Sequence, residues 1–163
     1  MNSDKEILLN GVDGIAALIP GNFIFCPTLC YRNTGLVARF DEQLKMVLDF
    51  EFILRLLTKG NQLLGLYAQP LFEYRRHASN ATSVLTQNLQ RFHEEQALYF
   101  ELANWLSGHG YVTLSKEATK MTVIKKNLIF LFLQAIVAGR FKLAYKYINH
   151  LMRMSALHNG LLK

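Results

Sequence analysis

One segment, from Phe40 to Gly60, constrains the fold most, because its pattern shows where a helix begins and which side of it is buried. Its hydrophobic residues recur at the three- and four-residue spacing of one helix face, and its charged residues fall on the opposite side. The hydrophobic set is Phe50, Ile53, Leu54 and Leu57, and the charged set is Glu51, Arg55 and Lys59. Gly60 can adopt the left-handed conformation that ends many helices. The pattern predicts an amphipathic helix that starts near Asp49 and stops at Gly60.

An aspartate at the start of a helix can have either of two roles. Its carboxylate can accept hydrogen bonds from the free N–H groups of the first turn, which contributes about 1 kcal/mol. It can also stand at the rim of a cleft and act as a base. Spacing alone favours the capping role for Asp49. On the other side of the helix, Glu51 and Arg55 form an i,i+4 pair that we expect to be exposed, and Asp41 and Glu42 are expected to cap a turn.

Length and composition indicate a globular protein: the chain has 163 residues, of which 51% are hydrophobic and 18% charged. Its acidic, polar start is unlike a signal peptide. The longest hydrophobic run, Leu128–Ala138, is broken by Gln134 and is shorter than the roughly 20 residues that cross a bilayer. We therefore expect no membrane-spanning helix and a cytoplasmic location. The two cysteines, Cys26 and Cys30, cannot complete a structural zinc site and are expected to be buried and reduced.

The pattern along the chain predicts an α+β protein that is mostly helical, with a small strand-containing body at residues 1–83 and a helical region at residues 84–163. The elements expected in the body are a helix at Asp4–Asn10, extended segments at Asn22–Cys26 and Leu29–Arg32, and strands at Gln62–Tyr67 and Pro70–Arg75. Those expected in the helical region are a helix up to the stop at Gly108–Gly110, one from Ser115 to Gly139, and one from Arg140 to Met154. Phe92, Tyr99 and Trp105 are expected in its core.

Three segments carry a family resemblance in a fixed order: GNFIFCPTLCYRN (21–33), FDEQLKMVLDFEFILRL (40–56) and PLFEYRRHASNAT (70–82). They include an aromatic-Arg pair, Phe-Asp-Glu, an Asp at a helix start followed by Leu-Arg-Leu, and a strand ending near Tyr-Arg-x-His. In this order and spacing they resemble the C-terminal half of family 2 glycosyltransferases. These enzymes have the GT-A fold and transfer a sugar from a nucleotide diphosphate donor to an acceptor. The resemblance covers about residues 15–95.

The resemblance implies a role for several residues. Asp49 falls where the family has its catalytic base, although Leu48 stands where many members have a glutamate. His77, with Arg75 and Arg76, falls where the family contacts the donor diphosphate, and His77 is the candidate metal contact. A basic surface cluster is an equally good interpretation of these three. Tyr31 and Arg32 would line the acceptor side, with a core tyrosine beside a surface arginine as the alternative.

The sequence lacks features of the donor-binding half of the family. It contains no Asp-x-Asp motif, no Gly-rich phosphate loop and no alternating strand–helix pattern. We therefore expect the chain to be the rear part of a longer enzyme and to be inactive alone. A divalent metal, Mg²⁺ or Mn²⁺, is expected only in the complete enzyme. The implied partners of that enzyme are a nucleotide sugar and a glycan or lipid acceptor.

The charge distribution supports an alternative function. The net charge of +6 divides into −2 for residues 1–110 and +8 for residues 111–163. The last predicted helix carries basic residues on one face, so residues 140–153 could bind an anionic membrane surface. The chain would then be a non-catalytic helical module that binds a membrane or a protein, with a peripheral position at the membrane. No nucleic-acid partner is expected, because no recognised motif surrounds the charges.

Overall fold

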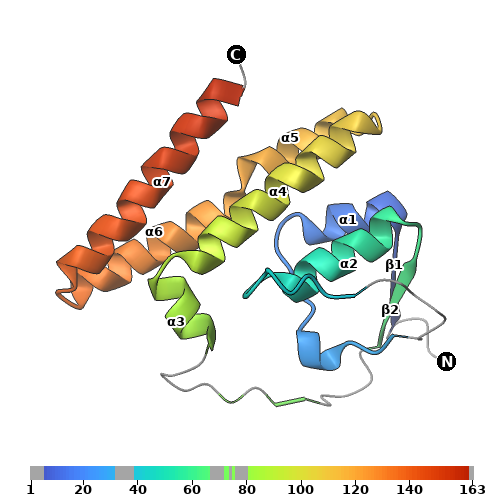
Figure 1. Cartoon of the computed structure of the whole chain (residues 1–163), viewed down its shortest axis with the longest axis horizontal. Helices are drawn as coiled ribbons and strands as arrows, with labels where there is room; N and C mark the ends of the chain where they lie inside the picture. The colour runs from blue at the N-terminus through green and yellow to red at the C-terminus, as the bar shows by residue number, and fades with distance from the viewer. Residues whose placement is uncertain (1–5, 32–38, 67–71, 74, 76–80, 162–163) are drawn as a thin grey trace. The chain divides into compact units, whose positions relative to one another are not determined.

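The computed structural model describes residues 6–31, 39–66, 72–73, 75 and 81–161. The chain divides into two compact units, residues 1–84 and residues 85–163. The described residues are mostly helical, with one antiparallel pair of strands (Figure 1), so the predicted α+β class is confirmed at this level.

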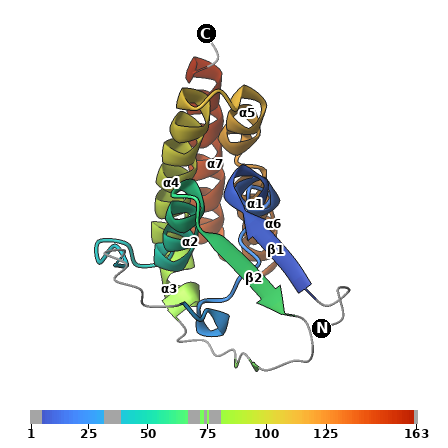
Figure 2. The same ribbon diagram turned by 90° about the vertical axis from the view of Figure 1, so that its right-hand side faces the viewer.

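The first unit contains the sheet. Strand β1 (Glu6–Asn10) pairs with β2 (Gln62–Leu66), with Glu6 opposite Leu66 and Asn10 opposite Gln62, as the two arrows in Figure 2 show. The strand predicted to begin at Gln62 is confirmed. The helix predicted at Asp4–Asn10 is wrong for the described residues, because this segment pairs with a strand more than fifty residues away. The capping pattern could stabilise a helix here only slightly. Pairing with β2 and burial of the Leu9 side chain stabilise the strand more.

Helices α1 (Gly11–Leu18) and α2 (Leu48–Thr58) pack against each other in the first unit. A Cβ atom at Gly14 would lie 3.1 Å from Leu9 and 3.2 Å from Leu57, so a residue without a side chain lets α1 approach the strand and α2. The buried side chains of this core come mainly from α2: they are Leu9, Ile15, Leu18, Val47, Phe50, Phe52, Ile53, Leu54, Leu56 and Leu57. The hydrophobic face predicted for α2 is confirmed.

The predicted stop of α2 is also confirmed. Gly60 has φ +79°, and the N–H groups of Gly60 and Asn61 donate to the carbonyls of Leu57 and Leu56 at 3.0 Å each. These two bonds form a Schellman motif, which satisfies carbonyls left free at the helix end.

The segment around Pro27 is extended but forms no strand. Phe25 and Leu29 have extended backbone angles, and between them lies a single turn of 3-10 helix, η2 (Cys26–Thr28). The strand predicted at Pro70–Arg75 lies largely outside the described residues. Phe72, Glu73 and Arg75 are described and belong to no helix or strand.

Helices form the second unit, with α3 lying across the division. Their bounds are α3 Ala81–Gln87, α4 Gln90–Gly108, α5 Val112–Lys120, α6 Thr122–Val137 and α7 Phe141–Leu161. Helix α4 packs along α5, and α6 packs along α7 (Figure 1). The single helix predicted from Ser115 to Gly139 is wrong. Met121, with φ +48°, separates α5 from α6, and the Ser115 hydroxyl caps no helix but donates to the Ala103 carbonyl at 2.8 Å.

An aromatic cluster joins α4 to α7 in the core of the second unit. The Phe92 side chain is fully buried, and its ring centroid lies 6.4 Å from that of Tyr147 and 6.2 Å from that of His150. Tyr99 is also buried. The predicted core positions of Phe92 and Tyr99 are confirmed, whereas Trp105 is only half-buried and stacks on His109.

Candidate functional site

Asp49 lies in the first turn of α2 but is not its N-cap. The N-cap residue is Val47, and no side chain caps it. The Asp49 Oδ1 atom accepts a hydrogen bond from the N–H of Phe50 at 2.8 Å. The carboxylate therefore accepts from one N–H of the first turn, although Asp49 does not occupy the capping position that spacing alone suggested.

The environment of Asp49 changes its acidity. The side chain is half-buried, and burial raises the pKa of its carboxyl above the ordinary value, although backbone N–H groups of Phe50 and Asp49 act in the lowering direction. Burial has this effect because it disfavours the charged form. A carboxylate with a raised pKa binds a proton more readily, which suits a general base.

A cluster of aromatic rings surrounds Phe52, one turn after Asp49 on α2. Phe52 follows Asp49 by three residues, so the two side chains are neighbours on α2. The ring of Phe52 is buried and contacts two others, with centroid distances of 5.6 Å to Tyr31 and 4.6 Å to Phe40. Tyr31 remains 56% exposed. The expected acceptor residue Tyr31 thus contacts α2 at Phe52, one turn after the expected base Asp49.

Cys26 lies close enough to Asp49 for the carboxylate to affect it. Although the Cys26 side chain is exposed, partial desolvation by its surroundings raises the pKa of its thiol, and the charge of Asp49 raises it further. We call Asp49, Phe52, Tyr31 and Cys26 the α2 site. No pattern in the sequence places Cys26 there, whereas the three-residue spacing from Asp49 could have identified Phe52.

The expectation that both cysteines are buried is wrong: Cys26 and Cys30 are free thiols and both are exposed. They were expected in a partly buried extended segment, but that segment forms no strand and also exposes Phe23 and Phe25. Its backbone is held by local bonds, such as that from the Thr28 N–H to the Phe25 carbonyl at 2.8 Å.

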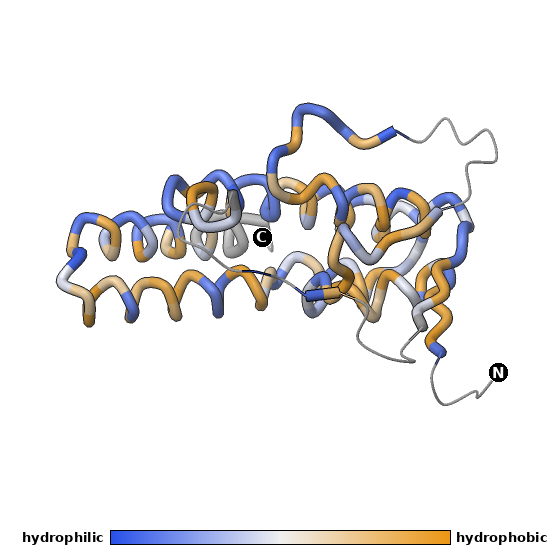
Figure 3. The backbone as a smooth tube through the Cα atoms, turned by 90° about the horizontal axis from the view of Figure 1, so that it is seen from below, coloured by the Kyte–Doolittle hydropathy of each residue, from blue (hydrophilic) through white to orange (hydrophobic). Residues whose placement is uncertain are grey.

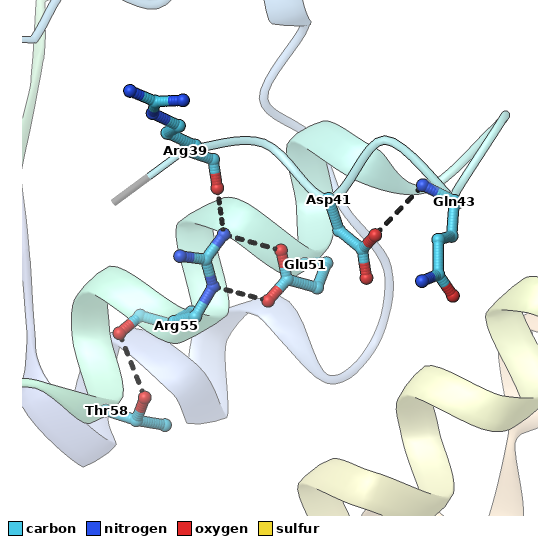
Figure 4. Close-up of polar contacts among 6 residues, drawn as sticks. All are labelled: Arg39, Asp41, Gln43, Glu51, Arg55 and Thr58. Atoms are coloured by element: carbon cyan, nitrogen blue, oxygen red, sulfur yellow. Dashed lines mark hydrogen bonds and ion pairs between the residues drawn. The ribbon is translucent and has the colours of Figure 1, made fainter. Parts of the chain in front are cut away.

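On the side of α2 away from the core, the guanidinium group of Arg55 bonds to a carboxylate and to a backbone carbonyl (Figure 4), and we call this arrangement the Arg55 fork. Arg55 donates from Nε and Nη2 to the two carboxylate oxygens of Glu51, at 2.6 and 2.9 Å. Its Nη2 also donates to the Arg39 carbonyl at 2.7 Å. The side chains of Arg55 and Glu51 are only 27% and 17% exposed. The prediction that this pair is exposed is therefore wrong. The pair is partly buried, because Arg55 also bonds to the backbone just before Phe40.

Asp41 has the role that the sequence suggested. Its Oδ1 accepts a hydrogen bond from the N–H of Gln43 at 2.9 Å, which closes an Asx turn just before α2 (Figure 4).

Several predicted site residues cannot be positioned. Arg32, Arg76 and His77 lie outside the described residues, and Arg75 is exposed. In the part of the chain that is described, no three His, Cys, Asp or Glu side chains gather closely enough to hold a metal ion. The expected metal contact, His77, is not in that part.

A second group of ionisable side chains lies inside the helical unit. His150 is buried and its ring lies 4.7 Å from that of the exposed His93. Burial first, and then the charges of His93 and Arg153, lower the pKa of His150. Among the described residues, none is placed to form a hydrogen bond with His150 Nε2. No motif in the sequence indicates this group, since His93 lies far from His150 and Arg153 in the chain.

Comparisons of the chain with family models, with curated proteins and with solved structures find no match. Among the described helices, none is both long enough and hydrophobic enough to cross a bilayer.

Proposed function

We propose that the chain is the C-terminal portion of a glycosyltransferase that moves a sugar from a nucleotide diphosphate donor to an acceptor hydroxyl, with Asp49 as the base. The family resemblance of the three sequence segments suggests the reaction. The observation that carries the proposal is the half-buried carboxylate of Asp49, whose pKa is raised, one helical turn before Phe52, which the exposed ring of Tyr31 contacts.

The proposed step uses Asp49 alone among the described residues. The acceptor oxygen attacks the anomeric carbon of the donor sugar, and a new C–O bond forms. The bond from that carbon to the diphosphate oxygen breaks on the opposite side, and the nucleoside diphosphate leaves with the electron pair. The acceptor proton passes to the Asp49 carboxylate. This in-line displacement inverts the anomeric configuration.

Tyr31 has the properties of an acceptor platform. Its ring is more than half exposed while its position is fixed by contact with Phe52. An exposed aromatic ring can pack against the apolar face of a sugar and leaves the sugar hydroxyls free. An acceptor on Tyr31 would lie near the turn of α2 that carries Asp49.

The remaining roles come from the resemblance. Arg75 and Arg76 would contact the donor diphosphate through guanidinium N–H groups, and His77 would lie beside the diphosphate or a divalent metal. When bound, such a metal would offset negative charge on the leaving group.

The test uses the protein made from the complete reading frame that encodes this chain, with release of nucleoside diphosphate from a panel of nucleotide sugars as the readout. Asp49→Asn is expected to lower the rate at least about 100-fold. Asp13→Asn is the matched control, because Asp13 is also in the first turn of a helix but is exposed. An Asp49→Asn protein as active as the control would exclude the base role.

A further inference from the structure

The outward side of α6 is hydrophobic. Its buried side chains, Ile124, Leu128 and Ala135, lie on one side of the helix. The helical repeat of 3.6 residues puts five large exposed hydrophobic residues on the opposite side. These are Ile129, Phe130, Leu133, Ile136 and Val137, and Val137 is 89% exposed. Hydrophobic residues predominate along this helix in Figure 3. A soluble helix normally places polar residues on such a side.

Helix α7 continues this pattern and adds charge. Its buried residues are Ala144, Tyr147, His150 and Met154. The exposed side has two parallel strips separated by about a quarter-turn of the helix. One strip is hydrophobic and contains Phe141, Tyr145 and Met152, and the other is basic and contains Lys142, Lys146 and Arg153. We call the exposed hydrophobic side chains of α6 and this strip of α7 the hairpin face.

The charge around the hairpin face has one sign. From Ala118 to the last residue the chain contains no Asp or Glu, and its basic residues are Lys120, Lys125, Lys126, Arg140, Lys142, Lys146, Arg153 and Lys163. Lys126 is exposed on the hydrophobic side of α6 itself. A lysine there can lie along an apolar surface with its ammonium group extended to the lipid headgroups.

We propose that the hairpin face is a peripheral membrane site that binds anionic bilayers, with α6 and residues 141–153 of α7 lying in the plane of the interface. The hydrophobic side chains enter the headgroup region and the lysines contact anionic headgroups. Tyr145 suits the interface because it combines an apolar ring with a polar hydroxyl. A second copy of this chain is a poorer partner, because it would bring the same positive charge to the contact. The site is independent of Asp49 and of glycosyl transfer.

The experiment is co-sedimentation of the folded protein with vesicles of phosphatidylcholine alone and with vesicles that also contain phosphatidylglycerol. The protein is expected to bind the anionic vesicles at least tenfold more tightly, and high salt is expected to weaken the binding. Lys142→Glu with Lys146→Glu should reduce partitioning about 30-fold or more, since each basic residue near an anionic surface contributes about fivefold. Lys116→Glu, on exposed α5 surface, should change partitioning much less.

A second pair of variants tests the hydrophobic part. Phe130→Ser with Val137→Ser is expected to reduce partitioning at least about tenfold, and it should leave the fold intact because both side chains are exposed. Tyr111→Ser with Val112→Ser is the control, since these residues are exposed and hydrophobic but belong to the start of α5.

Three results would overturn the proposal. They are equal affinity for neutral and anionic vesicles, equal loss in the test and control variants, and a hairpin face that instead mediates dimers without binding vesicles. Asp49→Asn protein should bind vesicles like the parent, so failure of this proposal and failure of the catalytic one can be told apart.

Discussion

The ring of Tyr31 lies 5.6 Å from the ring of Phe52, tilted by 57°. Phe52 is buried and Tyr31 is more than half exposed, so the contact holds an exposed aromatic ring at a fixed place on α2. Because Phe52 comes one turn after Asp49, this contact links the proposed acceptor platform to the proposed base.

Tyr31→Ala in the complete enzyme is expected to raise KM for the acceptor about five- to tenfold and to change kcat less, because the ring would bind ground state and transition state alike. Tyr31→Phe keeps the ring and should retain most of the affinity. Tyr111→Ala, in the other unit, serves as the control. Steady-state kinetics at varied acceptor concentration measure this KM. An unchanged KM in Tyr31→Ala would exclude Tyr31 as an acceptor platform.

The Arg55 fork predicts a stability difference between two helical ion pairs. Arg55→Ala should lower the free energy of unfolding by about 2 kcal/mol, because it removes charge-assisted hydrogen bonds to Glu51 and to the Arg39 carbonyl at a partly buried position. Lys120→Ala removes an exposed pair with Glu117 and should cost less than about 0.5 kcal/mol. Urea denaturation measures both values. Equal losses would mean that the fork contributes no more than a surface pair.

Two glycines at the end of α4 should respond to alanine in opposite directions. Gly108 is helical, whereas Gly110 has φ +83°, and an added Cβ would meet no atom within 4 Å at either position. Gly108→Ala should therefore stabilise the fold by about 0.5–1 kcal/mol through the unfolded state. Gly110→Ala should cost about 1 kcal/mol or more, since alanine is strained in the left-handed region. Thermal unfolding should show a higher melting temperature for Gly108→Ala and a lower one for Gly110→Ala. Shifts of the same sign in both variants would contradict this prediction.

Acid sensitivity of the helical unit is expected to depend on His150. Its pKa is lowered in the folded state, so below the ordinary pKa of histidine the unfolded chain binds a proton that the native state resists. Stability should therefore fall as the pH drops below about 6.5, by at most about 1.4 kcal/mol per pH unit. His150→Leu should flatten this part of the curve. Melting temperatures measured between pH 7.5 and 5 test this prediction. If their dependence on pH is unchanged in His150→Leu, groups other than His150 cause it.

Local patterns in the sequence predicted the elements whose cause is local. The hydrophobic spacing of α2 and the glycine stop at Gly60 are examples, since both follow from a few adjacent residues. Such local patterns cannot predict the pairing of two strands that lie far apart in the chain. Strand β1 exists because it pairs with β2, and the capping pattern before it indicated a helix. The break at Met121 was missed for a similar reason, because a buried methionine with positive φ gives no turn signal.

The α2 site was predicted only in part. Asp49 was identified by its position at a helix start and by the resemblance. The contacts of Phe52 with Tyr31 and Phe40 depend on how the preceding loop folds over α2, and the exposure of Cys26 depends on the absence of a strand there. Neither property can be read from residue spacing.

The pH dependence of kcat/KM tests the role of Asp49 most directly. This quantity reports ionisations of the free enzyme, so its acid limb should coincide with the carboxyl titration of Asp49 followed by NMR. Both should lie above the ordinary pKa of aspartate, because burial raises the pKa of this carboxyl. Activity should rise with pH through that shared pKa, and the acid limb should disappear in the residual activity of Asp49→Asn. An acid limb that keeps its position in Asp49→Asn, or that differs from the Asp49 titration, would exclude Asp49 as the base.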